Sequence, residues 1–184
     1  MHVDRCAVLI PGANFGPHAP LLFFSGFAAR ARGAEPVAIN WDPPADRFKD
    51  TEWTHRWVRE QVEPVLDDIE AVSPPLLVGK SLGTFAASLA AERGLPAVWH
   101  TPLITREPVA EAIRRATAPC LLIGGTADPS WDGKLARQLS SHVLEVEGAN
   151  HGMFITDAPL AESAAVMGRV ATAVEKFLDD AVWG

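Results

Sequence analysis

The segment Leu76-Leu77-Val78-Gly79-Lys80-Ser81-Leu82-Gly83 joins a short apolar run to an alanine-rich stretch at Thr84–Ala90. The apolar run has the length and composition of a buried strand, and the stretch after it is typical of a helix. Between them stands G-x-S-x-G, a turn motif that exposes a serine where a strand meets a helix. Because the turn is tight, Gly79 and Gly83 remove side chains that would collide with the neighbouring backbone. The segment predicts an α/β fold with Ser81 as an exposed nucleophile.

The turn also places Ser81 beside backbone donors. A helix that begins directly after Ser81 directs its free N–H groups and its positive dipole end toward a developing oxyanion. A phosphate-binding loop is the alternative interpretation of Gly79-Lys80-Ser81, but its consensus needs a glycine where the sequence has Pro74. Lys80 could act as a lysine base, yet adjacent residues of a turn point different ways. We therefore expect a structural ion pair for Lys80.

Short apolar runs alternate with longer amphipathic stretches along the chain, which is typical of β-α units wound around a parallel sheet. Strands are expected at Cys6–Pro11, Pro36–Asn40, Leu76–Gly79, Ala97–His100, Cys120–Gly124 and Val143–Val146. Helices are expected at His18–Arg32, Thr51–Val72, Leu82–Arg93, Glu107–Ala116, Asp132–Ser140 and Pro159–Val182. Pro64 falls inside the second helix and should kink or split it. We predict a three-layer α/β/α sandwich around a mainly parallel sheet of about six strands.

Length, charge and cysteine content limit the number of domains, the partners and the location that the protein can have. The 184 residues are enough for one domain with a hydrophobic core, so residues 1–184 are expected to form a single domain. The net charge of -7 argues against a nucleic-acid surface, and the apolar runs are too short for a membrane span. The first residues show no secretory signal, and Cys6 and Cys120 lie inside expected strands. These features favour a cytoplasmic location without a structural disulfide.

Two later strands lead to an acid and a base at the same edge of the sheet. The run Cys120–Ile123 is followed by Asp128, and the run Val143–Val146 is followed by His151. Imidazole titrates near neutral pH, so His151 could take the proton of Ser81 and later give it to a leaving group. Asp128 would orient the ring and stabilise its charged form. Asp132 is the alternative acid, although it stands where a helix cap is expected.

A glycine-rich loop follows the first expected strand and reads Pro11-Gly12-Ala13-Asn14-Phe15-Gly16. The backbone N–H groups of Ala13 and Leu82 would form an oxyanion hole. Asn14 could add a side-chain donor, but tolerance of left-handed turn geometry is the favoured explanation for an asparagine near glycines.

Residues near the expected strand ends supply a candidate acyl or alcohol pocket. The substrate-binding candidates are Phe15, Trp41, His100, Trp131 and Met153. Packing in the core or at the rim is the alternative role for the aromatic residues, and a structural hydrogen bond is the alternative for His100. The remaining histidines lack the spacing of a metal site, so no metal or organic cofactor is expected.

The chain order Ser81, Asp128, His151 and the G-x-S-x-G turn resemble the α/β-hydrolase superfamily. The sequence is similar to compact, capless, esterase-like members, including dienelactone-hydrolase-like proteins, over nearly its whole length. Family members usually have His-Gly where this chain has Pro11-Gly12, and dienelactone hydrolases have a cysteine nucleophile where this chain has Ser81. The resemblance implies that a cap can precede the strand of Asp128. Only residues 101–119 are available there, so a shallow, open pocket is expected.

These observations predict a serine hydrolase that cleaves a carboxylic ester or related acyl bond through an acyl-Ser81 intermediate. The expected partner is a small-molecule ester or acyl substrate, with neither nucleic acid nor membrane involved. Two alternatives use the same fold. One is a catalytically silent binding protein, and the other is an acyltransferase that passes the acyl group to an acceptor other than water.

Overall fold

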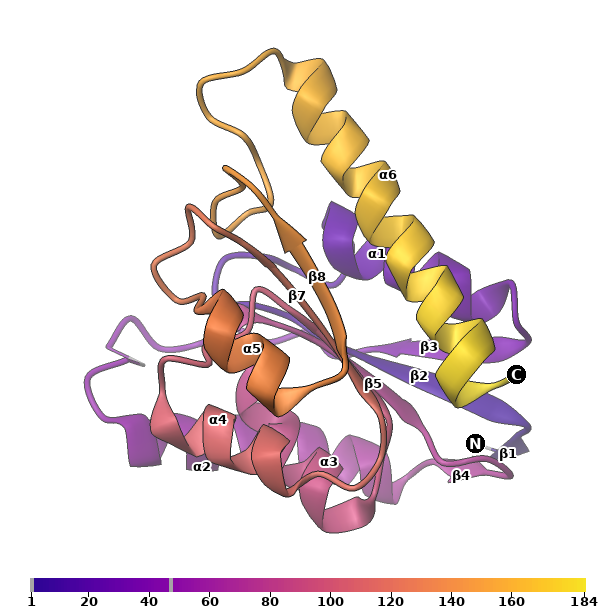
Figure 1. The fold of residues 1–184 in the computed structure, drawn as a ribbon. Coiled ribbons are helices and arrows are strands. Elements are labelled where there is room, and N and C mark those ends of the chain that lie inside the picture. Colours follow the sequence, from indigo (N-terminus) through magenta and orange to yellow (C-terminus); the bar gives the residue numbers. More distant parts are fainter. Residues whose placement is uncertain (1, 47) are drawn as a thin grey trace.

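Six parallel strands form the central sheet of the protein, which a computed structural model describes at residues 2–46 and 48–184 (Figure 1). The strands are β2 (Arg5–Ile10), β3 (Ala34–Ala38), β5 (Leu76–Lys80), β6 (Ala97–His100), β7 (Cys120–Gly125) and β8 (His142–Val146). Their spatial order is β3-β2-β5-β6-β7-β8, and every neighbouring pair is parallel. All six expected strands are present, each close to its predicted bounds.

Helices cover both faces of this sheet and give the predicted three-layer arrangement. The helices α1 (Pro20–Arg30) and α6 (Leu160–Phe177) pack against each other on one face (Figure 1). The other face is covered by α2 (Thr51–Asp67), α3 (Ala87–Arg93), α4 (Glu107–Arg115) and α5 (Gly133–Leu139). Because both faces are buried, the strands read as continuous apolar runs instead of alternating ones.

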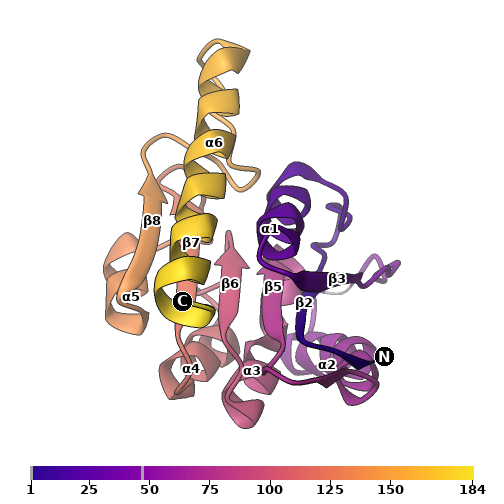
Figure 2. The same ribbon diagram turned by 90° about the vertical axis from the view of Figure 1, so that its right-hand side faces the viewer.

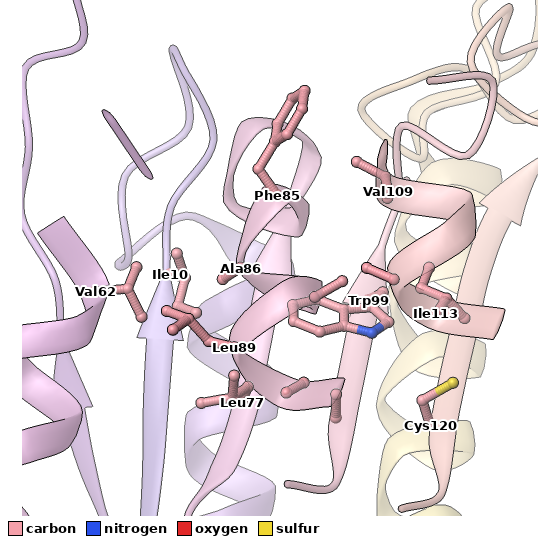
Figure 3. Packing of buried hydrophobic residues seen from close by; sticks show 14 of the residues in the cluster. Ile10, Val62, Leu77, Phe85, Ala86, Leu89, Trp99, Val109, Ile113 and Cys120 are labelled. Carbon is pink, nitrogen blue, oxygen red and sulfur yellow. The ribbon is translucent and has the colours of Figure 1, made fainter. Parts of the chain in front are cut away.

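Successive side chains of each strand enter two separate cores. From β2, Cys6 and Val8 face the layer of α2 to α5, whereas Ala7 and Leu9 face α1 and α6. Figure 3 shows the first core, in which the ring of Trp99 from β6 packs among side chains of α3 and α4. Burial of a large apolar side chain contributes roughly 1.5–3 kcal/mol, so these two cores hold the three layers together.

The helix expected at Leu82–Arg93 has a different first half. Residues Ser81–Ala86 form a 3-10 helix, η1, and only Ala87–Arg93 is α-helical. The 3-10 helix is wound more tightly than an α-helix, and it follows a sharp turn at Ser81. The tight winding therefore begins at the candidate nucleophile.

The helix α2 is not split at Pro64 and continues for three residues beyond it. It ends at Asp67 and not at Val72 as expected. Residues Glu70–Ala71 instead form β4, which pairs with β1 (His2–Val3) in a small parallel ribbon that the sequence pattern did not indicate.

The last helix, α6, continues as a π-helical turn, η2 (Leu178–Val182), so the segment expected at Pro159–Val182 is helical nearly throughout. The guanidinium of Arg5 lies 5.6 Å from the ring centroid of Trp183, which brings the two ends of the chain together (Figure 1). Within residues 2–46 and 48–184, none of the helices combines the length and apolar character that a membrane crossing requires.

The direction in which the chain adds strands to the sheet reverses between β2 and β5. After β2 the chain forms β3 on one side, then crosses to β5 on the other side and continues outward to β8. The connection after β2 therefore leads to one side of the sheet and the connection after β5 leads to the other. Sheets of this kind usually bind ligands at the carboxyl ends of two such strands. Figure 2 shows β5, β6 and β8 pointing to this edge. Ser81 follows β5 directly, so it stands at this edge of the sheet, beside the point where the strand order reverses.

Candidate active site

Ser81 occupies the sharp turn between β5 and η1, where its φ is 50°. A residue with a side chain seldom adopts positive φ, so this backbone is strained. A Cβ at position 83 would lie 2.6 Å from the carbonyl oxygen of Ile10, and one at position 79 would lie 2.5 Å from the Trp99 ring. A side chain at position 83 would therefore collide with the backbone of β2, as expected. A side chain at position 79 would collide chiefly with the ring of Trp99.

Hydrogen bonds from Thr84 hold this turn in place. Its Oγ1 donates to the carbonyl oxygen of Ser81 at 2.6 Å and accepts from the N–H of Leu103 at 3.2 Å. Thr84 is fully buried, so water does not compete for these bonds. The turn is thereby tied to the segment that follows β6.

Side chains from three different loops form one hydrogen-bonded chain. His151 Nε2 lies 2.7 Å from Ser81 Oγ, and His151 Nδ1 lies 2.7 Å from Asp128 Oδ2. An ionised carboxylate can only accept hydrogen bonds, so Nδ1 carries the ring proton and Nε2 presents its lone pair to the serine hydroxyl. Ser81 and Asp128 are buried, and the His151 side chain is 36% exposed. This arrangement can deprotonate Ser81 and keep the resulting imidazolium paired.

The two candidate acids have different partners. Asp128 Oδ1 accepts from the backbone N–H of Ser130 at 2.8 Å, while its Oδ2 faces His151. Asp132 caps α5, since its Oδ1 accepts from the N–H groups of Lys134 and Leu135, both at 2.9 Å. The structure therefore brings Asp128 to the histidine and leaves Asp132 in the capping role that was its alternative.

The loop that carries His151 is shaped by Asn150, a residue that the sequence analysis did not single out. Asn150 Oδ1 accepts from the N–H groups of Gly152 at 2.8 Å and Phe154 at 3.1 Å. Asparagine favours such turns because its side chain bonds the backbone two residues on, and this signal was readable from Asn150-His151-Gly152. Asn150 thus holds the loop in shape, and both ring nitrogens of His151 are left to interact with Asp128 and Ser81.

The loop after β2 carries the other candidate backbone donor. The N–H of Gly12 donates to the carbonyl oxygen of Phe15 at 2.9 Å, and Trp41 Nε1 donates to the carbonyl oxygen of Gly12 at 3.1 Å. Ala13 lines the cavity in front of Ser81, and Leu82 is the next residue of η1. Their N–H groups remain the candidates for the oxyanion hole. Trp41 braces this loop and does not line the cavity, which corrects its expected substrate contact.

A cavity of about 720 Å³ lies in front of Ser81 and His151. Its apolar wall consists of Ala13, Phe15, Phe48, Leu103 and Pro129. Phe15 was expected to contact substrate and Ala13 to donate to the oxyanion, whereas Phe48, Leu103 and Pro129 were not singled out from the sequence. Phe48 stands in the irregular segment between β3 and α2, and Leu103 in the segment after β6. Both residues follow strands that end at this edge, and this was the one feature of the sequence that indicated a place near the cavity.

Three further pocket candidates are buried away from this cavity. Met153 is fully buried in the core beneath α6. Trp131 packs against Gly124, and its Nε1 donates to Glu145 Oε2 at 2.7 Å. These positions correct the expectation that Met153 and Trp131 contact substrate, because core packing already occupies both side chains.

His100 is the third of these candidates and is fully buried. Its Nε2 lies 2.8 Å from Ser25 Oγ of α1. Burial, together with the positive charge of Lys80, lowers the pKa of His100 to about 3, so its ring is neutral. The structural hydrogen bond was the alternative role for His100, and it replaces the expected substrate contact.

Lys80 lines the cavity, although a structural ion pair was expected for it. It is the last residue of β5 and is 4% exposed. In the part of the chain that the structure describes, no carboxylate lies within 4.0 Å of its Nζ. The Nζ lies 4.8 Å from the centroid of the Phe15 ring, within cation–π range. The expected ion pair is therefore absent among these residues.

Replacing Lys80 by methionine should stabilise the protein at neutral pH. Burial lowers the pKa of Lys80 from 10.5 to about 8, against the attraction of Asp128. This difference corresponds to a folding cost on the order of 3 kcal/mol at pH 7. The folded protein loses this proton at lower pH than the unfolded chain, so the wild type should regain stability between about pH 8 and 10.5. The advantage of Lys80→Met should shrink over the same range.

Urea unfolding at pH 7 and pH 10 measures both parts of this prediction. Lys134→Met is the matched control, because Lys134 is exposed on α5 and its removal should change the free energy of unfolding by less than about 0.5 kcal/mol. A Lys80→Met protein that is less stable than the wild type at pH 7 would contradict the assigned desolvation cost.

Comparisons with known proteins bear on the fold. No protein-family model matches the sequence, and a search of curated proteins finds no match. Among solved structures, Est1E from Butyrivibrio proteoclasticus, with bound ferulic acid, is 14% identical; the match covers 97% of this chain and 89% of that chain, with a TM-score of 0.67. An α/β serine hydrolase homologue from Coxiella burnetii is 15% identical over 95% of this chain and 85% of that chain, with a TM-score of 0.60.

A lidless α/β serine hydrolase from Xanthomonas campestris is also similar. It is 15% identical, and the match covers 95% of this chain and 82% of that chain with a TM-score of 0.54. These similarities and the six-stranded parallel sheet define the class of the protein. It has the α/β-hydrolase fold, in a compact form in which α4 is the one helix between β6 and β7.

Proposed function

We propose that the protein is a serine hydrolase that cleaves a carboxylic ester or a related acyl bond. The observation that carries this proposal is the hydrogen-bonded chain from Ser81 through His151 to Asp128. Each group suits one role: the hydroxyl attacks, the imidazole moves the proton, and the buried carboxylate orients the ring. The cavity in front of Ser81 would hold the substrate.

The first half of the reaction forms an acyl-enzyme. Ser81 Oγ attacks the carbonyl carbon of the substrate while His151 Nε2 takes the hydroxyl proton, and Asp128 pairs with the imidazolium. The carbonyl oxygen becomes an oxyanion, for which the N–H groups of Ala13 and Leu82 are the proposed donors. The bond from carbon to the leaving oxygen then breaks. His151 Nε2 gives its proton to that oxygen, an alcohol leaves, and an ester on Ser81 remains.

Water completes the cycle by the same path. His151 Nε2 removes a proton from a water molecule as the water oxygen attacks the acyl carbon. When the bond from this carbon to Ser81 Oγ breaks, Nε2 returns the proton to Oγ and the carboxylic acid leaves. Every step uses groups of this chain and one water molecule.

The fold neighbours support an activity on small molecules. The structure of Est1E holds ferulic acid, and the cavity of this protein is of a size suited to a compact ligand. We further propose that residues 1–184 form one domain that acts in the cytoplasm. In that reducing compartment the buried thiols of Cys6 and Cys120 would stay free.

Labelling with a fluorophosphonate probe tests the proposed function. Ser81 Oγ should displace fluoride from phosphorus, and mass spectrometry of the digested protein should locate the adduct on Ser81. His151→Ala should slow this labelling by about 10²-fold or more, because the hydroxyl loses its base. Heat-denatured protein is the control for non-specific reaction. A folded wild type that forms no adduct would favour the catalytically silent binding protein instead.

A further inference from the structure

We propose that the cavity in front of Ser81 takes an acyl substrate with a free carboxylate, which Lys80 binds inside the cavity and Arg106 attracts at its rim. The inference rests on the proposed function, because it names the class of substrate for the same site. The carboxylate is a second group of the substrate, separate from the ester that is cleaved. Half-esters of dicarboxylic acids have this composition.

The charges that line the cavity have one sign. Lys80 and Arg106 both contribute to its wall, and the lining residues within the described part of the chain include neither Asp nor Glu. The chain as a whole has 23 acidic and 16 basic residues, so the cavity differs from the overall charge of the protein. A cavity of this kind attracts anions and repels cations.

Among the residues that the structure describes, the ammonium of Lys80 has no carboxylate within 4.0 Å. Asp128, whose charge attracts it, already accepts from the N–H of Ser130 and from His151, so its carboxylate is committed. The neighbouring His100, paired with Lys80 across β5 and β6, is neutral. Phe15 offers only the face of its ring. The donors of Lys80 therefore remain available to a ligand.

The fold makes room for this lysine. A Cβ at position 12 would lie 3.0 Å from Lys80 Cδ, so Gly12 leaves space for the aliphatic part of the side chain. A buried, unpaired charge lowers the stability of a fold, whereas a carboxylate ligand would pair with it in a site that excludes water. The arrangement costs stability in the free protein and favours the bound anion.

The position of Lys80 limits the length of the substrate. Lys80 and Ser81 are consecutive, so their Cα atoms are about 3.8 Å apart. Because Lys80 and Ser81 also line the same cavity of about 720 Å³, the carboxylate and the scissile carbonyl lie in the same small molecule and not at the two ends of a long chain. Arg106 is exposed where α4 begins, and its fork of donors suits a carboxylate that approaches from solvent.

Matched esters test this proposal. The substrates are the monoethyl esters of succinic, glutaric and adipic acid, each compared with its diethyl ester, and ethanol release gives kcat/KM. The wild type should prefer at least one monoester over its diester by about 10-fold or more. Lys80→Met should reduce this preference by about 10-fold or more, and Arg106→Met by a smaller factor that disappears at high salt.

Lys134→Met is the control for the loss of one exposed positive charge that does not line the cavity, and its preference should equal that of the wild type. Thermal unfolding of each variant shows that the compared proteins are folded. A wild type that hydrolyses the diesters as well as the monoesters would overturn the proposed substrate class. So would an unchanged preference in folded Lys80→Met.

Calorimetry on the Ser81→Ala protein separates the failure of this proposal from the failure of the proposed function. This protein cannot turn the monoester over, so it should bind it, and adding Lys80→Met should abolish that binding. Hydrolysis of diesters alone, without monoester binding, would leave the hydrolase function standing and reject the carboxylate site. Monoester binding that needs Lys80, in a protein whose Ser81 does not react with the probe, would reject hydrolysis and retain the site.

Discussion

Ser81→Ala should abolish ester hydrolysis, lowering kcat by roughly 10⁶-fold. The substitution removes the oxygen that attacks the substrate and leaves His151 without a proton to accept. Alanine at a φ of 50° is no more strained than serine, so the free energy of unfolding should change by no more than about 1 kcal/mol. Initial rates on a neutral ethyl ester and urea unfolding measure the two parts of this result.

Ser25→Ala is the matched control for Ser81→Ala. Ser25 Oγ lies 2.8 Å from His100 Nε2, so this pair has the same atoms at nearly the same distance as Ser81 and His151. Ser25 and His100 are both buried and do not line the cavity. The variant should lose about 1–3 kcal/mol of stability, because the ring nitrogen loses its partner, yet keep its activity per folded molecule. Hydrolysis that survives in Ser81→Ala would reject the assigned nucleophile.

The sheet and the edge that carries the site could be predicted because buried parallel strands have a simple sequence signature. The run Cys120–Ile123 is apolar throughout, since its side chains enter the cores on both faces. Parallel strands end at the same edge, so residues that follow strands were expected to meet. Ser81, Asp128 and His151 each follow a strand, and hydrogen bonds join them in the structure.

The pocket could not be predicted in the same way, because a position after a strand does not determine where a side chain points. Met153 and Trp131 both follow strands that end at this edge, yet both side chains turn inward. The direction depends on turn geometry, such as the φ of 63° at Met153, which hydrophobic periodicity does not report. Phe48 shows the converse, since it lines the cavity from a segment without a helix or strand pattern.

Lys80 was expected to form a structural ion pair because adjacent residues of the turn point different ways and a lysine base would have to be desolvated. Whether a partner is present depends on which loops approach the end of β5, and several of these loops are irregular. Asp128 follows β7 and attracts Lys80, but its oxygens serve Ser130 and His151. The sequence therefore could indicate the candidate acid without showing that Lys80 would have no ion-pair partner among the residues that the structure describes.

Asp128→Asn should lower kcat by about 10⁴-fold and leave the fold intact. The N–H of Ser130 donates to Oδ1, so the amide oxygen of the new asparagine keeps that place and its NH2 group takes the place of Oδ2. An NH2 group cannot accept from Nδ1–H, so the His151 ring must carry its proton on Nε2 instead. A protonated Nε2 cannot take the proton of Ser81. Initial rates on a neutral ethyl ester measure the loss.

The same substitution at Asp132 separates the orientation of the ring from the loss of a negative charge near the site. Asparagine caps helices about as well as aspartate, so Asp132→Asn should keep the N-terminal cap of α5 and stay within about twofold of wild-type activity. Both variants lose one charge from the same loop, yet only Asp128→Asn changes which nitrogen of His151 carries the proton. Equal activity losses in the two variants would mean that charge near the loop matters more than ring orientation. A loss confined to Asp132→Asn would make Asp132 the acid, and the bond between Asp128 and His151 would then have to break before reaction.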